Sequence, residues 1–358
     1  MNIQKATQQY ETWLNNFTSL VEADLIFKHQ QMAQDVFPFM RATFYRWVQV
    51  WPDLCKELST APQVLCVGDL HVENFGTWRD SEGRLVWGVN DFDEACYLPY
   101  TNDLVRLATS AQLAIQANHL EVKVADACTA ILTGYDAGLK AGGCAFVLAE
   151  DHAWLRSIAL SIVRDPIFFW QKLDKLPKVK GGGSESALVA LEHSLPEADL
   201  AYQLKHRVAG LGSLGHPRFV ALADWRGGKI AREVKALVPS ARYWVSADEG
   251  TAEILYLGIL DRAIRCQDPF VQLQGHWIVR RLAPDCSRIE LATLPKEHDE
   301  TALLYAMGYE TANIHLGSKQ AVKLVQQDLK KRPKRWLEKA ANDMTKATQI
   351  DWKSWKSG

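Results

Sequence analysis

The sequence has no cysteine framework. Its seven cysteines are odd in number and scattered, and none of them forms a Cys-x-x-Cys pair. A disulfide-stabilised domain or a structural zinc site would need paired cysteines, so we expect neither. Unpaired thiols persist in a reducing compartment, which favours the cytoplasm.

Long apolar runs and an excess of charge of one sign are also absent. The chain offers no run of about 18 apolar residues that could cross a bilayer, and residues 1–8 lack the apolar core of a signal peptide. The 41 basic residues nearly balance the 42 acidic ones and leave a formal net charge of -1. We therefore expect no membrane span and no nucleic-acid partner.

Composition and length favour a folded protein with two lobes. Hydrophobic residues make up 47% and charged residues 23% of the chain, as in ordinary globular domains. Its 358 residues exceed the size of ~250 to 300 residues at which single cores stop growing. Nothing in the sequence specifies the oligomeric state.

The periodicity changes along the chain and predicts an α+β protein. Helical spacing dominates residues 1–177, apart from two short strand-like runs, and a glycine-rich linker follows at residues 178–187. Residues 188–295 contain short apolar runs separated by glycine turns, which is typical of a β-rich lobe. Residues 296–358 return to helical spacing, and we expect these helices to return to the first lobe.

The densest group of chemically active side chains follows the two strand-like runs. Asp69 comes directly after the first run, Asn74 lies five residues later, and Asp91 and Asp93 follow the second run on one face of an extended segment. A solvated turn would explain either pattern alone, but their proximity favours a site. Phosphoryl transfer needs an Asp to orient the attacking hydroxyl and oxygen ligands for Mg²⁺. We predict Asp69 as the base and Asn74, Asp91 and Asp93 as Mg²⁺ ligands.

A second group of candidate residues lies far downstream. Gly210, Gly212 and Gly215 form a G-x-G-x-x-G pattern that includes Ser213, and Lys235 falls on the next predicted strand. A kinase glycine-rich loop and its phosphate-binding lysine have this order and spacing. An ordinary glycine turn and a solvated strand lysine are the alternatives. A dinucleotide-binding turn is disfavoured because a strand, and not a helix, follows the glycines.

A phosphate-binding lysine of this kind needs an acidic partner to hold it in place. Two glutamates, Glu249 and Glu253, begin the next predicted helix. We predict Glu253 as the partner of Lys235 and include it in the candidate ATP site.

Several segments resemble known families. Residues 68–74, Gly-Asp-Leu-His-Val-Glu-Asn, resemble the catalytic loop of aminoglycoside phosphotransferase and choline-kinase-like enzymes, and residues 91–93 resemble their metal-binding triplet. A closer resemblance is to the bacterial Domain of Unknown Function 2252 family, which belongs with the kinase-like proteins. The segments that carry this closer resemblance are residues 37–41, 68–76, 90–95, 103–108, 210–215, 234–235, 268–270, 278–282 and 312–315.

The resemblance implies a bilobal protein-kinase-like fold with ATP and Mg²⁺ as cofactors. Because the catalytic motifs precede the nucleotide lobe, we expect this fold to be circularly permuted. By the same resemblance, Asp103 holds the backbone of the catalytic loop, with Arg106 close by. Arg41 would pair with a carboxylate of the loop or contact phosphate, or else lie on the surface, and His71 would be structural. Where the family often has an acidic residue after the strand lysine, this chain has Ala236.

The predicted function is ATP- and Mg²⁺-dependent phosphotransfer to a hydroxyl acceptor, either a small molecule or a protein, which the sequence does not identify. A non-catalytic nucleotide-binding module and an AMP-transferring enzyme are the alternatives. Asp69-x-His71 is also similar to the opening motif of metallophosphoesterases. Their downstream Gly-Asn-His motif and paired late histidines do not occur here, which makes this third alternative the weakest.

Overall fold

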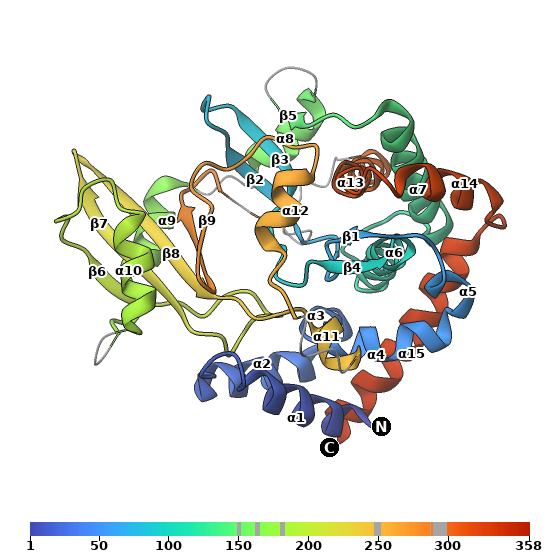
Figure 1. The fold of residues 1–358 in the computed structure, drawn as a ribbon, viewed down its shortest axis with the longest axis horizontal. Helices are drawn as coiled ribbons and strands as arrows, with labels where there is room; N and C mark the ends of the chain where they lie inside the picture. The colour runs from blue at the N-terminus through green and yellow to red at the C-terminus, as the bar shows by residue number, and fades with distance from the viewer. Residues whose placement is uncertain (149–151, 162–164, 180–182, 247–251, 287, 289–298) are drawn as a thin grey trace.

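The protein is a mixed α+β structure, as the sequence predicts (Figure 1). It is a computed structural model that describes the chain except residues 149–151, 162–164, 180–182, 247–251, 287 and 289–298. The predicted boundary at residue 295 and the centre of the predicted linker therefore lie outside the described residues. The end of that linker is helical, because α10 begins at Glu185.

The first helices of the chain lie along one side of the molecule together with the last one (Figure 1). They are α1 (Ile3–Leu14), α2 (Glu22–Gln34), α3 (Val36–Ala42), α4 (Phe44–Leu54), α5 (Lys56–Ser59) and α15 (Trp336–Ser357). The last helix packs against α2 and α3, and Gln4 Nε2 donates a hydrogen bond to Ser354 O at 2.7 Å. The two ends of the chain therefore lie side by side.

Two small antiparallel sheets carry the loops with the candidate carboxylates. Their strands are β1 (Gln63–Cys66) paired with β4 (Cys96–Pro99), and β2 (Phe75–Arg79), β3 (Leu85–Val89) and β5 (Phe146–Val147) in that order. The turn between β2 and β3 is closed by Asp80, whose Oδ1 accepts hydrogen bonds from the N–H groups of Glu82 and Arg84. The strands are mostly buried, so the core fixes the points at which the polar loops begin.

A closely packed group of helices supports these sheets. It consists of α6 (Thr101–Gln116), α7 (Val124–Ala141), α13 (Glu300–His315) and α14 (Val322–Lys331). A Cβ atom built on Gly134 of α7 would lie 1.9 Å from Tyr305 O, and one on Gly308 of α13 would lie 2.1 Å from Ile131 O. Glycine therefore allows the two helix backbones to touch at this crossing.

A five-stranded antiparallel sheet forms the other part of the molecule (Figure 1). In sheet order its strands are β6 (Gln203–His206), β7 (Arg218–Trp225), β8 (Gly228–Ala236), β10 (Trp277–Leu282) and β9 (Gln272–Gln274). A hairpin is formed by β7 and β8. Its turn residues Arg226 and Gly227 both have positive φ, 47° and 86°, and this conformation matches the twist of paired strands.

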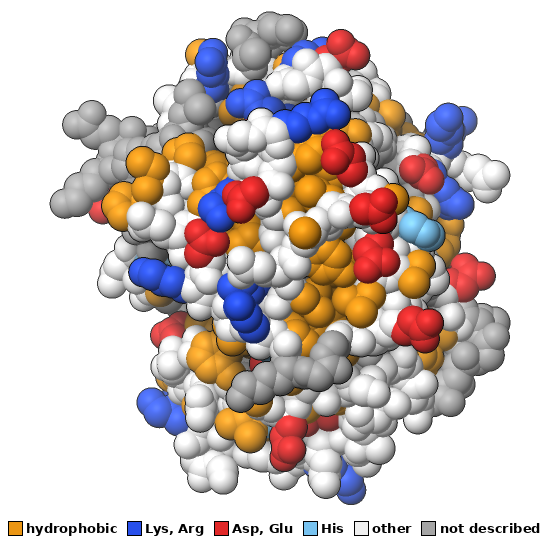
Figure 2. Space-filling model, turned by 90° about the vertical axis from the view of Figure 1, so that its left-hand side faces the viewer, with side chains coloured by type: hydrophobic (Ala, Val, Ile, Leu, Met, Phe, Trp, Pro, Cys, Tyr) orange, Lys and Arg blue, Asp and Glu red, His pale blue; other side chains and the backbone are white. Residues whose placement is uncertain are grey.

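Each face of this sheet is covered by one short helix. On one face, α10 (Glu185–His193) buries Ala187 and Leu191 against Val234 and Trp277. On the other face, α9 (Pro166–Asp174) packs Phe169 and Leu173 near one end of the strands. Figure 2 views the molecule from the side of the sheet and shows apolar side chains gathered in the middle of this surface, with charged side chains around them.

Three further helices connect these parts. They are α8 (Ala153–Ser161), α11 (Ala241–Ser246) and α12 (Tyr256–Arg262). The helix that we expect to begin at Glu249 or Glu253 begins only at Tyr256 in the described residues, and Glu249 lies outside them. Among the described residues, none of the helices combines the length and the apolar character that crossing a membrane would require.

Candidate functional site

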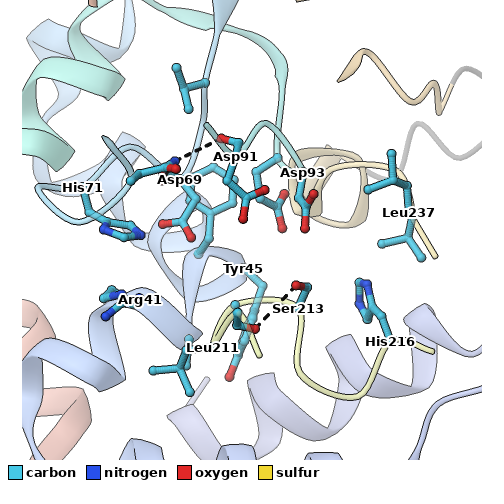
Figure 3. Close-up of a pocket in the computed structure, with 18 of the residues that line it drawn as sticks. Arg41, Tyr45, Asp69, His71, Asp91, Asp93, Leu211, Ser213, His216 and Leu237 are labelled. Atoms are coloured by element: carbon cyan, nitrogen blue, oxygen red, sulfur yellow. Dashed lines mark hydrogen bonds between the residues drawn. The ribbon is translucent and has the colours of Figure 1, made fainter. Parts of the chain in front are cut away.

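The first candidate loop leaves β1 through a position that only glycine fits. Gly68 has φ +82°, and a Cβ atom there would lie 2.3 Å from the backbone oxygen of Glu94. The loop can therefore turn sharply against the segment that follows Asp93. This turn brings Asp69 next to Asp91 and Asp93, although they come from different sheets (Figure 3).

Asp103 fixes the backbone of this loop from the start of α6. Its carboxylate oxygens accept hydrogen bonds from Val67 N at 2.7 Å and Gly68 N at 3.0 Å. His315 of α13 lies 3.1 Å from the same carboxylate and 2.8 Å from the hydroxyl of Tyr135. All these groups are buried, so each hydrogen bond also satisfies a polar atom that water does not reach. This is the position that the resemblance implies for Asp103, and His315 is part of the same support.

Those residues do not form a convincing metal site of their own. Cys66, Asp103 and His315 place ligand-type atoms within 4.8 Å of one another, the only such group of three among the described His, Cys, Asp and Glu side chains. The carboxylate is already engaged by backbone N–H groups, and Cys66 Sγ donates to Leu98 O at 3.5 Å. Burial raises the pKa of Cys66, which disfavours the thiolate that a metal would need.

Asp69 is held by a buried arginine. Arg106 Nε donates to Asp69 Oδ1 at 2.8 Å, and Arg106 Nη2 donates to the same oxygen and to Met40 O. The guanidinium carbon lies 5.1 Å from the ring centre of Phe44 and 4.9 Å from that of Trp47. Burial raises the pKa of Asp69 and Arg106 opposes the shift. Arg106 thus engages one oxygen of Asp69, and Oδ2 lies on the side of the glycine-rich loop.

Asn74 and Asp91 each present a buried oxygen that accepts no hydrogen bond from a described residue. Both hydrogens of the Asn74 amide are directed at backbone oxygens, of Asp69 at 3.2 Å and of Asp91 at 3.0 Å. Asn74 Oδ1 and Asp91 Oδ1 are buried and lack hydrogen-bond partners in the described part of the chain. Buried polar atoms are normally satisfied, and neutral and anionic oxygens are the ligands that Mg²⁺ prefers. These two oxygens therefore fit a magnesium ion.

Asp93 lies beside Asp91 and contacts Lys235. The Nζ atom donates to both carboxylate oxygens of Asp93 and lies 3.7 Å from Asp91 Oδ1. Burial and the charge of Asp91 raise the pKa of Asp93 to about 6. Burial acts in the same direction on Asp91, but Lys235 and two arginines outweigh it and lower the pKa of that group. Asp91 is therefore the carboxylate of the pair that stays ionised, and Asp93 is the one that takes up a proton more readily.

The prediction that Glu253 pairs with Lys235 is not met. Glu253 is exposed and precedes α12, which begins only at Tyr256. Lys235 is buried on β8, and its acidic partners are the two aspartates from the distant loop. The sequence favours Glu253 because it begins the next predicted helix after the strand. The partner is decided instead by the packing of the sheet against the loop that carries Asp91 and Asp93.

The glycine-rich loop between β6 and β7 lies opposite the aspartates (Figure 3). Gly210 and Gly215 have positive φ, +75° and +100°, so the pattern marks real conformational requirements. Ser213 Oγ accepts a hydrogen bond from Arg218 at 2.9 Å. Of the three glycines, Gly212 lies nearest to Asp69, since a Cβ atom on it would lie 3.4 Å from Asp69 Oδ2.

The N-terminal helices hold this loop in place. Lys28 Nζ donates to Gly212 O at 2.9 Å, and Val21 N donates to Gly215 O at 2.8 Å. A Cβ atom on Gly215 would lie 2.4 Å from Leu25 Cδ2. The loop is thus packed against α2, which no pattern in the sequence predicts.

Arg41 and His71 complete the rim of the site. Arg41 Nη1 donates to Glu73, a carboxylate of the catalytic loop, which is one of the two contacts expected for this arginine. His71 Nδ1 accepts a hydrogen bond from Glu73 N at 3.2 Å. Burial and the charge of Arg41 lower the pKa of His71, so the ring is neutral near pH 7.

Several residues around the cavity were not predicted. Tyr10 and Tyr45 line it from the N-terminal helices, and Glu94 lines it directly after the aspartates. Burial raises the pKa of Glu94 to about 7, and its carboxylate accepts a hydrogen bond from Ala241 N at 2.8 Å. The position of Glu94 next to the Asp-Phe-Asp triplet was a usable signal, whereas the tyrosines carry none.

Residues 20–158 match the model of a family described as "Uncharacterized protein conserved in bacteria (DUF2252)". The match includes Asp69, Asn74, Asp91, Asp93 and Asp103 but not the glycine-rich loop or the strand lysine. Neither the curated proteins nor the solved structures include a significant match. The match agrees with the resemblance to this one family over residues 20–158.

Proposed function

We propose that the protein is an ATP- and Mg²⁺-dependent phosphotransferase with a bilobal, kinase-like architecture in circularly permuted order. The observation that carries this proposal is the contact of Lys235 with Asp93, 142 residues away in the sequence, and with Asp91 next to it. A strand lysine, a glycine-rich loop on the same sheet, and an Asp and Asn pair on the opposing loops are the parts that phosphoryl transfer requires.

Each residue has a distinct role in the proposed chemistry. Asp69 orients and deprotonates the acceptor hydroxyl through Oδ2, because Arg106 engages Oδ1. Asn74 and Asp91 would hold Mg²⁺ through their Oδ1 atoms, which lack hydrogen-bond partners among the described residues, and the ion would supply neutralisation of phosphate charge when bound. Lys235 would contact phosphate oxygens from its position beside the aspartates, and the glycine-rich loop would cover the phosphates.

The helix that leads into the catalytic loop in other kinase-like folds has an equivalent in α13. Just beyond α13, Ser318 Oγ accepts a hydrogen bond from Leu65 N at 2.8 Å, which places the end of this helix next to β1. The chain ends meet elsewhere, where Gln4 contacts Ser354. If the two termini of a kinase-like chain in the usual order were joined and that chain were cut between its equivalents of α13 and β1, its elements would follow the order of this protein. Such circular permutations are tolerated when the termini lie close together.

Turnover of Mg·ATP is the direct test. The protein is incubated with ATP labelled at either the γ- or the α-phosphate, with and without Mg²⁺, and label is followed into inorganic phosphate or an acceptor pool. Phosphotransfer predicts Mg²⁺-dependent release or transfer of the γ-label and none of the α-label. Transfer of the α-label instead would indicate the AMP-transferring alternative. No turnover in the presence of intact Mg·ATP binding would leave a non-catalytic nucleotide-binding module.

A further inference from the structure

A second cavity lies beside the candidate site. It has a volume of about 330 Å³ and shares Gly210 and Arg288 with the cavity around Asp69. Its walls come from the five-stranded sheet, from α9 and from the hairpin of β2 and β3. Six arginines line it: Arg207, Arg218, Arg265, Arg280, Arg281 and Arg288.

These arginines outnumber the acidic groups around them. Glu233 is buried in the sheet and accepts hydrogen bonds from Arg280 at 2.8 Å, from Arg218 at 3.3 Å and from Arg207. Burial raises the pKa of Glu233, but the three guanidinium groups outweigh it and lower the pKa, so the group is ionised. Asp268 is the only acidic residue among the described side chains of the cavity wall. Glu233 therefore orients three arginines but cannot neutralise them.

Some of the donors have no partner in the described structure. Arg281 Nε and Nη2 and Arg265 Nε are buried and make no hydrogen bond to any described residue. The guanidinium carbon of Arg281 lies over the ring of Phe270, 4.3 Å from its centre, and this contact holds the guanidinium group in place. Buried cationic donors without acceptors are costly, and the planar fork of arginine matches phosphate oxygens.

The position of Glu233 on β8 differs from the strand pattern of kinases. In the Val-Ala-Ile-Lys pattern of kinases, a small alanine lies two residues before the strand lysine. Here that position is Glu233, and its side chain is on the same face of the strand as Lys235. Next to Lys235, this face of the sheet therefore carries the ion cluster of Glu233 and its three arginines in place of a small apolar side chain.

We infer that this cavity binds a polyphosphate group, held by the arginines that line it, three of which Glu233 orients. The inference rests on the proposed function for the origin of that group, which is either the nucleotide itself or a phosphorylated acceptor. Binding of the group needs neither Mg²⁺ nor turnover.

Calorimetric titration with inorganic tripolyphosphate in EDTA tests the site. Wild-type protein is expected to bind one equivalent, and Arg281→Gln to bind roughly tenfold or more weakly because a bidentate contact is lost. Arg281→Lys keeps the charge, and we expect an intermediate loss because it lacks the fork. Arg226→Gln is the matched control, because this arginine lies in the turn between β7 and β8 and its side chain is 74% exposed. This variant should bind tripolyphosphate as tightly as the wild type.

Absence of binding by the wild type, wild-type affinity in both Arg281 variants, or an equal loss in Arg226→Gln would overturn the inference. A repeat titration with saturating ATP separates the two sources. Competition assigns the cavity to the phosphates of the nucleotide, and independent binding assigns it to a phosphorylated acceptor; both support the site. Tripolyphosphate binding without Mg·ATP turnover would refute only the proposed function, and turnover without tripolyphosphate binding would refute only this inference.

Discussion

Replacement of Lys235 by methionine tests the electrostatics of the candidate site directly. Its side chain is 1% exposed and contacts Asp93 through both carboxylate oxygens, with Asp91 at 3.7 Å. Methionine keeps the apolar stem but leaves two aspartates with side chains only 19% exposed without this cation, and among the described residues Asp91 keeps only Arg288, at 3.6 Å from its Oδ2, as an ion-pair partner. Breaking a buried ion pair by removing one partner costs about 3 to 5 kcal/mol, so we expect a loss of this size in the free energy of unfolding at pH 8.

The loss should shrink at low pH. Asp93 has its pKa raised to about 6 in the folded protein, so its contribution to stability is present in acid and is lost as the pH rises through that value. Without Lys235, the pKa of Asp93 rises further, and the difference between variant and wild type grows above pH 6. At pH 5 the proton already neutralises Asp93, and the destabilisation should be clearly smaller than at pH 8.

Urea unfolding at pH 5 and pH 8 measures both quantities. Lys229→Met on the same strand is the control, because this lysine is 32% exposed and forms only surface ion pairs with Asp174 and Asp224. We expect it to change the free energy of unfolding by less than about 1 kcal/mol. Mg²⁺ should stabilise Lys235→Met more than wild type, since the ion can replace the lysine charge. A loss below about 1 kcal/mol at pH 8, or an equal loss at both pH values, would refute this account.

Three other substitutions test the remaining parts. Asp91→Ala should reduce Mg²⁺-dependent ATP turnover roughly 100-fold or more, and unchanged turnover in a phosphate-release assay would contradict the metal assignment. Asp69→Asn should leave Mg·ATP affinity nearly intact while reducing transfer by roughly 10²- to 10⁴-fold; equal losses in binding and transfer would argue against its role as base. Gly308→Ala forces a Cβ atom to 2.1 Å from a backbone oxygen of α7 and should lower stability by about 1 to 3 kcal/mol in thermal unfolding. Gly258→Ala in α12 meets open space and should be neutral or stabilising, so equal melting temperatures for the two glycine variants would show that the helix crossing does not need glycine.

The catalytic-loop half of the site could be read from the sequence because its elements are local. Asp69, Asp91 and Asp93 follow short apolar strands, Asn74 lies directly before β2, and the core fixes where such strands begin and end. Asp103 was assigned by resemblance, and its hydrogen bonds to Val67 and Gly68 agree with that assignment. The glycines at 210 and 215 also proved to need positive φ. Their functions stay predictions.

The partner of Lys235 could not be read in this way. Glu253 is near in sequence and acidic, yet it is exposed, while Asp93 lies 142 residues away and contacts the lysine. The same limit applies to the docking of the glycine-rich loop on α2 and to the six arginines of the second cavity, which come from separate strands and loops. No periodicity links such residues, because sheet pairing and helix packing bring them together.

The sequence by itself therefore determined the mixed α+β class, the strand-end carboxylates, the glycine turn conformations and the absence of a spanning helix in the described residues. These follow from side-chain period, backbone freedom and local polarity. Only the tertiary structure decided that Lys235 faces Asp91 and Asp93, and that Glu233 gathers three arginines beside them. Buried charges depend on what surrounds them in space, because the cost of removing them from water is met only by partners within a few ångströms.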